Sequence, residues 1–122
     1  MGEAVIDRTK FTEALEYLNR VGWTTGSVGY GSQERPCCVG GAIAHVITGD
    51  GLDLYSSGDP DDQGYAKVRP YLEAILEHLG LDWESLYPYP ESAIIDWNDH
   101  TPEGEAKKEQ EVKTLLRELG EA

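Results

Sequence analysis

Two adjacent cysteines, Cys37 and Cys38, are the residues of this chain best suited to nucleophilic chemistry. Pro36 precedes them and an apolar helical pattern follows, so we expect both thiols in the first turn of a helix. The free N–H groups and the dipole at that end of a helix lower the pKa of a thiol. The competing interpretation is structural, with one cysteine in the core and the other covering the helix start.

A nucleophilic thiol also needs a base within hydrogen-bond reach and a group that orients the base. His45 lies seven residues beyond Cys38, roughly 10 Å along an ideal helix, and is therefore too far away. His100 follows Asn98 and Asp99, and Cys, His and Asn or Asp together form the catalytic set of papain-like hydrolases. These residues define one candidate function, a small cysteine-dependent hydrolase or transferase.

The Trp97-Asn98-Asp99 segment also has a structural interpretation. Thr101 and Pro102 follow it and are typical of a helix start. Asn and Asp side chains just before such a start can accept hydrogen bonds from its free N–H groups. We therefore predict that this segment caps the last helix while the indole anchors the turn in the core.

The loop over residues 50–64 holds the most concentrated carboxylates, Asp59, Asp61 and Asp62. Carboxylates are calcium ligands, but this spacing lacks the alternation of an EF-hand and its glutamate at the twelfth position. We predict a solvated turn, with no metal site and no cofactor. Tyr55, Tyr87 and Tyr89 also fall in loops, and tyrosines among carboxylates are typical of a protein-binding rim. These six residues are the candidate binding residues.

The net charge of −13 is unevenly distributed along the chain. Residues 1–49 carry −1, residues 50–99 carry −10 and residues 100–122 carry −2. Phosphate contacts need clustered Lys and Arg, so direct binding to nucleic acid or to anionic lipid is disfavoured. A basic protein partner remains compatible with this charge.

The chain has the size of one domain, and we expect residues 1–122 to form it, with frayed ends at 1–8 and 120–122. Neighbouring cysteines cannot form an unstrained disulfide, so free thiols and a reducing cytoplasm are predicted. The N-terminal residues lack a signal peptide, and no apolar run is long enough to span a bilayer. The sequence leaves the oligomeric state open.

Apolar periodicity predicts an all-α fold with four main helices, over residues 9–20, 38–47, 65–79 and 101–119. A short turn is expected over residues 82–86, with Trp83 and Leu86 inward, and Ser92 could cap a short helix that contains Ile94, Ile95 and Trp97. Residues 24–36 are rich in glycine and form a loop after the first helix. Gly40 and Gly41 weaken the second helix, which suggests that another element closely approaches its backbone. We predict that this helix is central and that Trp23 folds back over the end of the first helix.

Three segments together resemble an uncharacterised family of actinobacterial and actinophage proteins, domain-of-unknown-function family 6197. They are Gly22-Trp23-Thr24, Cys38-Val39-Gly40-Gly41-Ala42-Ile43 with a Cys-x-x-Gly-Ala-Ile pattern, and Trp97-Asn98-Asp99. Either Cys37 or Cys38 can be the counterpart of the family cysteine. The resemblance implies a phage or actinobacterial setting and no particular chemistry.

The leading functional hypothesis is a non-enzymatic acidic module that binds a host or phage protein through the face formed by residues 50–99. One version is mimicry of DNA by carboxylates such as Glu73 and Glu77, which would inhibit a nucleic-acid enzyme. The alternatives are the cysteine-dependent enzyme described above and a structural or assembly protein.

Overall fold

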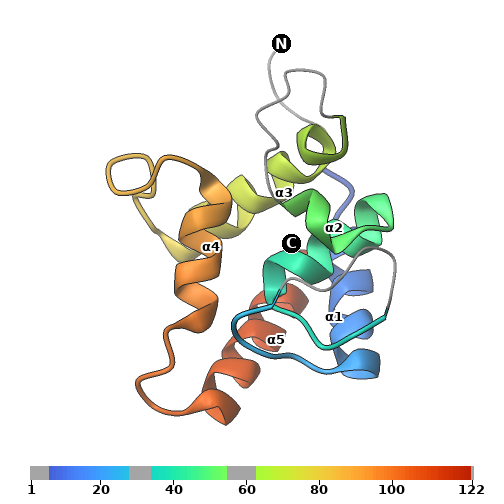
Figure 1. Cartoon of the computed structure of the whole chain (residues 1–122), viewed down its shortest axis with the longest axis vertical. Coiled ribbons are helices and arrows are strands. Elements are labelled where there is room, and N and C mark those ends of the chain that lie inside the picture. The colour runs from blue at the N-terminus through green and yellow to red at the C-terminus, as the bar shows by residue number, and fades with distance from the viewer. Residues whose placement is uncertain (1–5, 28–33, 55–62, 122) are drawn as a thin grey trace.

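The chain folds into five α-helices and one short 3-10 helix in the computed structural model, which describes residues 6–27, 34–54 and 63–121. The helices are α1 (Thr9–Val21), α2 (Val39–Thr48), η1 (Gly51–Leu54), α3 (Gln63–Leu79), α4 (Pro90–Asp99) and α5 (Glu105–Glu121) (Figure 1). The described residues form no β-strand, and one isolated bridge pairs Trp23 with Cys37. The prediction of a mainly helical fold is confirmed.

The four-helix description needs one correction, because α4 is a full helix. It spans ten residues, as many as α2, and its N-cap is Tyr89, where the sequence predicted only a short helix capped by Ser92. Pro90 occupies the first helical position, where its missing N–H has no intrahelical partner to lose. The last helix begins at Glu105 rather than at 101, because Gly104 adopts a φ of +99° just before it.

Helix α2 lies at the centre of the fold, as predicted. Every residue from Val39 to Ala44 is buried, and α2 packs against α1, α3, α4 and η1. A Cβ added at Gly40 would lie 2.9 Å from both methyl carbons of Leu54 and 3.3 Å from Cγ2 of Ile94. Gly40 therefore lets η1 and α4 approach the α2 backbone, which confirms the close approach expected from the glycines.

Helix α5 packs against α1 and covers the core beside it (Figure 1). Arg8 Nη1 donates to the carbonyl of Leu119 at 3.0 Å, and a Cβ at Gly120 would lie 2.5 Å from Thr12 Oγ1. The helix continues to Glu121, beyond the residue where the sequence predicted fraying to begin. No described helix is both long and apolar enough to cross a bilayer.

Helix α4 packs on α2 and α3 but makes few direct contacts with α5. The Trp97 side chain of α4 contacts α5, because the Lys108 ammonium lies 4.3 Å from its ring centroid. The 80–89 segment that connects α3 to α4 runs along the outside of α4 (Figure 1). Leu86 was expected inward, but its side chain is 76% exposed, so this prediction was wrong.

The substitution Gly40→Ala tests the packing at the centre. Alanine should gain up to about 1 kcal/mol in helix propensity, but its methyl group meets a fully buried Leu54. We expect a net loss of about 1–3 kcal/mol in the free energy of unfolding, measured by urea denaturation. In a Leu54→Ala background the same change should cost less, because the clash is removed. An equal cost in both backgrounds would contradict the packing described.

Candidate functional site

The Asn98 side chain joins three segments that are far apart in the sequence. Its Oδ1 accepts hydrogen bonds from the Trp23 indole N–H at 2.7 Å and from the Val39 backbone N–H at 3.0 Å. Its Nδ2 donates to the Thr24 carbonyl at 3.2 Å and to Asp99 Oδ1 at 3.0 Å. The residue is fully buried, and these four bonds use both its acceptor and its donor capacity.

This arrangement corrects the predicted role of the Trp97-Asn98-Asp99 segment. All three residues lie within α4, and Asn98 binds the first N–H of α2 rather than the start of the last helix. Asp99 Oδ1 accepts from the Gly26 N–H at 3.1 Å and so holds the loop after α1. The segment therefore ties α4 to the α1–α2 connection, while the sequence placed it next to α5.

The two thiols are buried, which opposes nucleophilic catalysis. Both thiols were expected in the first turn of the helix, but Cys38 is the N-cap of α2 and Cys37 lies before it, in the bridge with Trp23. The Cys38 Sγ accepts from the Gly41 N–H at 3.3 Å. Each cysteine is only 1% exposed. Burial raises the pKa of Cys37 to about 12 and that of Cys38 to about 11. His100 is exposed, and no hydrogen bond between described residues joins its ring to either thiol.

Four of the six candidate binding residues, Tyr55, Asp59, Asp61 and Asp62, lie outside the described residues. The described part of the chain holds no group of three or more His, Cys, Asp or Glu side chains arranged to bind a metal ion. Tyr87 and Tyr89 are described, and Tyr89 is 50% exposed. Tyr87 lines a surface groove beside α4, whereas Tyr89 does not.

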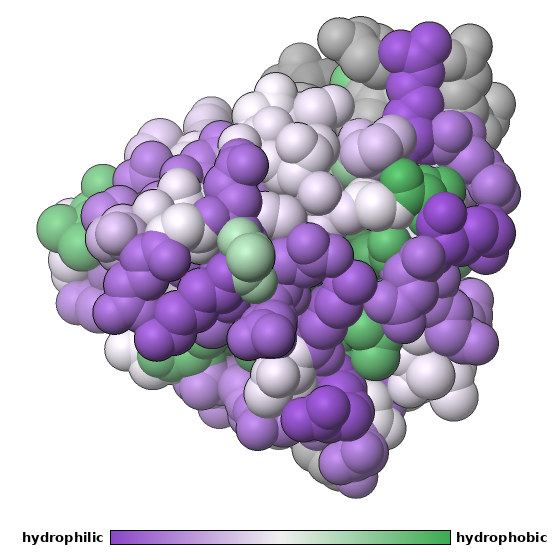
Figure 2. Space-filling view, turned by 90° about the horizontal axis from the view of Figure 1, so that it is seen from below, coloured by the Kyte–Doolittle hydropathy of each residue, from purple (hydrophilic) through white to green (hydrophobic). Residues whose placement is uncertain are grey.

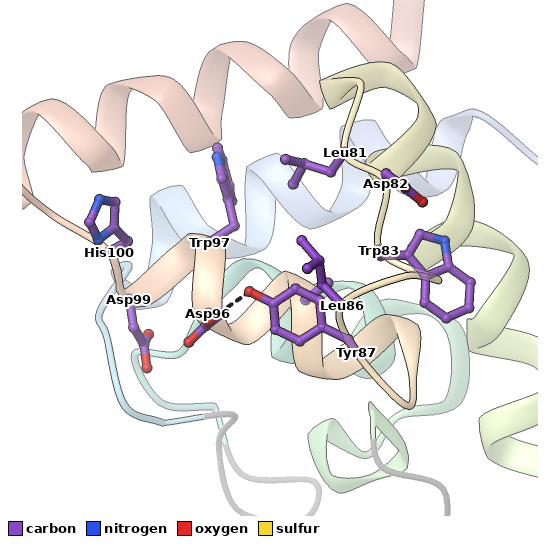
Figure 3. Close-up of a pocket in the computed structure, with 10 residues that line it drawn as sticks. Leu81, Asp82, Trp83, Leu86, Tyr87, Asp96, Trp97, Asp99 and His100 are labelled. Atoms are coloured by element: carbon purple, nitrogen blue, oxygen red, sulfur yellow. Dashed lines mark hydrogen bonds between the residues drawn. The ribbon is translucent and has the colours of Figure 1, made fainter.

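This groove, which we call the aromatic groove, is a pocket of about 380 Å³ between α4 and the 80–89 segment. Five large apolar or aromatic side chains line it, namely Leu81, Trp83, Leu86, Tyr87 and Trp97. Three carboxylates, Asp82, Asp96 and Asp99, also line it, together with Ala93 and His100. Figure 3 shows Leu81 and Leu86 between the indoles of Trp97 and Trp83. The result is an apolar hollow with negative charge at its edges.

Local backbone and side-chain hydrogen bonds hold the 80–89 segment in place. Gly80 adopts a φ of +72° and ends α3, and the Leu81 N–H then donates to the Leu76 carbonyl at 3.0 Å. A turn follows in which the Tyr87 N–H donates to the Trp83 carbonyl at 2.8 Å. The Tyr87 hydroxyl donates to Asp96 Oδ2 at 2.6 Å, which fastens the segment to α4 (Figure 3) and raises the pKa of Tyr87.

Three further depressions adjoin the aromatic groove. The first, of about 330 Å³, shares Leu81, Asp82 and Trp83 with it and adds Glu73, Glu77 and Glu84. We call this depression the acidic pocket. The second lies between α3 and α5 and shares Trp97, and the third lies at the start of α5 and shares His100. Figure 2 shows the molecule from below, where hydrophilic side chains cover most of the surface and smaller hydrophobic patches lie among them.

The charge of the segment from Pro70 to Asp99, which carries this groove, is one-sided. Residues 70–99 contain seven acidic side chains and neither Lys nor Arg. The nearest cation before this segment is Arg69, whose guanidinium carbon lies 6.0 Å from the Trp83 ring centroid and whose Nε bonds Glu73 at 3.3 Å. The predicted site residues did not include Leu81, Trp83, Leu86 or Asp96, although the absence of Lys and Arg over residues 70–99 was a usable signal.

Removing the Asn98 amide should strongly destabilise the fold. In Asn98→Ala the Trp23 indole N–H, the Val39 N–H and the Thr24 carbonyl lose their partner inside the protein. We expect a loss of about 3 kcal/mol or more in the free energy of unfolding, measured by urea denaturation. Asn19→Ala, at an exposed position on α1, is the control and should change it by less than about 0.5 kcal/mol. Similar losses in both variants would refute the role given to Asn98.

The raised thiol pKa values predict slow modification of the folded protein. At pH 8 both thiols should react with iodoacetamide at least about 100-fold more slowly than in the urea-unfolded chain, because they are buried and protonated. Mass spectrometry of timed samples measures both rates, and the unfolded chain is the control. Rapid alkylation near pH 6 would show a depressed pKa and would revive the catalytic interpretation.

Comparison with known proteins gives a family but no activity. No curated protein and no solved structure matches the chain. The model of a family of unknown function, DUF6197, matches residues 6–122, which include all five helices. The chain therefore belongs to the DUF6197 family.

Proposed function

We propose that this chain is a non-enzymatic protein-binding module and that the aromatic groove receives its partner. The observation that carries this proposal is the collection of large apolar side chains left accessible there. Leu81 and Leu86 are 41% and 76% exposed, and both line the same pocket. Exposed aliphatic and aromatic side chains with a polar edge are typical of protein interaction sites.

The groove is also held rigidly enough to act as a preformed surface. The Tyr87–Asp96 hydrogen bond fastens one wall to α4, and the Asn98 bonds fasten α4 to α2. A preformed site avoids the entropic cost of ordering a loop when the partner binds. This supports recognition through a fixed shape.

The burial of the thiols supports a binding function over the cysteine-dependent alternative. A thiol with a pKa of about 11 or 12 is almost fully protonated at neutral pH and is a poor nucleophile. Both cysteines instead fill the core beside the start of α2. The free, buried thiols are compatible with action in a bacterial cytoplasm. The resemblance to actinobacterial and actinophage sequences supports a host or phage protein as the partner.

Site-specific photo-crosslinking tests this function directly. A benzophenone amino acid replaces Leu86 in the groove, and the chain is irradiated in an actinobacterial lysate. We expect a defined crosslinked protein at this position, because a partner seated in the groove must contact residue 86. Mass spectrometry identifies the product.

The matched control places the same amino acid at Leu52. This leucine is 47% exposed on η1 and lines none of the four depressions. The proposal predicts no product, or a much weaker one, from position 52. Equal products from both positions, or none from position 86, would count against the groove as the binding site.

A further inference from the structure

We infer that the partner presents a basic segment, in which arginine or lysine lies close to an aliphatic or aromatic anchor. This inference rests on the proposed function and specifies the chemistry of its partner. It follows from the aromatic groove and the acidic pocket, which lie side by side on the surface. One depression is apolar and the other is acidic, and they share a single wall.

The aromatic groove is suited to the anchor. Its volume of about 380 Å³ lies at the lower end of ligand pockets, roughly 300–1,000 Å³, and suits one or two large side chains. Ala93 also lines the groove, where it is nearly fully buried and contributes only a methyl group. Burying an apolar side chain here would also cover Leu86.

The acidic pocket is suited to the cation. Glu73, Glu77, Asp82 and Glu84 line it together with Leu81 and Trp83. Glu73 is paired with Arg69, and Asp82 accepts from Ser85 Oγ at 2.9 Å. The carboxylates of Glu77 and Glu84 make no hydrogen bond or ion pair with another described residue. Two carboxylates beside the groove are therefore available to a basic partner.

Trp83, in the wall that the two depressions share, shows how a cation can bind there. Arg69 of the chain itself lies against Trp83 while it bonds Glu73, so one guanidinium contacts the aromatic ring and a carboxylate together. A guanidinium from the partner would find the same ring and the carboxylates of Glu77 and Glu84 at the acidic pocket. The anchor and the cation must be close in the partner, because only Leu81, Asp82 and Trp83 separate the two depressions.

The charge of residues 70–99 opposes other macromolecular ligands. Residues 70–99 supply seven acids and no Lys or Arg, which repels nucleic acid, anionic lipid and acidic peptides. A neutral apolar segment fits the groove but offers no cation to the carboxylates of Glu77 and Glu84. Charge complementarity therefore favours the basic segment.

Fluorescence anisotropy with synthetic peptides tests this inference on the full chain. The probe is a fluorescein-labelled peptide with a leucine anchor and arginines at several spacings from it. Two matched peptides replace the leucine by serine or the arginines by glutamine. We expect both to bind at least about tenfold more weakly than the probe, and the affinity of the probe should fall as salt rises.

Variants of the protein locate the binding. Leu86→Ser should weaken the probe at least about tenfold, whereas Leu52→Ser should not change it. The double variant Glu77→Gln/Glu84→Gln should weaken it about three- to tenfold at low salt. Glu16→Gln/Glu121→Gln makes the same change in net charge at exposed positions outside all four depressions and should have little effect.

The outcomes separate this inference from the proposed function. If Leu86→Ser weakens binding but the glutamine peptide and Glu77→Gln/Glu84→Gln bind as before, the groove is a binding site and the basic partner is refuted. If both acidic double variants weaken binding equally, the attraction is only to net charge and the inference is also refuted. If the probe binds no better than the serine peptide and Leu86→Ser has no effect, the inference fails, while crosslinking from position 86 still decides the proposed function separately.

Discussion

The Asn98 amide is the constraint on which the rest of the structure depends. It lies fully buried and holds the Trp23 indole, the Thr24 carbonyl and the first N–H of α2 at once. A buried amide with all its hydrogen bonds made specifies one arrangement, because any shift leaves several polar groups without partners. One side chain therefore ties α4 to the start of α2.

The surface beside α4 follows from this constraint. Asn98 points into the core, so its neighbours Trp97 and Asp99 both line the aromatic groove. Trp97 bridges toward α5, where its ring meets Lys108, and Asp96 holds the hydroxyl of Tyr87. The same helix thus supplies the core contact on one side and the groove on the other. Two tyrosine–carboxylate bonds, Tyr87 with Asp96 and Tyr65 with Glu91, attach α4 to the segments before it.

Helical periodicity predicted the helices whose buried faces are continuous. The bounds of α1, α2 and α3 agree with the predicted ranges to within two residues, and the burial of Gly40 against Leu54 explains its place in a helix. Periodicity could not predict the length of α4, because Pro90 reads equally as a loop residue and as a helix start. The apolar pattern also placed Leu86 in the core, but the turn that holds Leu86 leaves its side chain exposed to solvent.

The site was harder to predict because it depends on distant contacts. The Trp97-Asn98-Asp99 motif was singled out from the sequence, but local spacing suggested a cap for the helix that follows it. The actual partners lie 59 and 75 residues earlier, at Val39 and Trp23, which no local rule reveals. The cysteines looked reactive because Cys38 does cap a helix start, yet the sequence does not show that the same start is buried under α4.

Hydrogen exchange measured by NMR tests the central role of Asn98 most directly. The Trp23 indole N–H and the Val39 amide should exchange as slowly as the most protected amides of α2, since releasing either requires the core to open. Their opening free energies should both equal that of global unfolding. Exchange of either proton at the rate of an exposed loop amide would contradict this account.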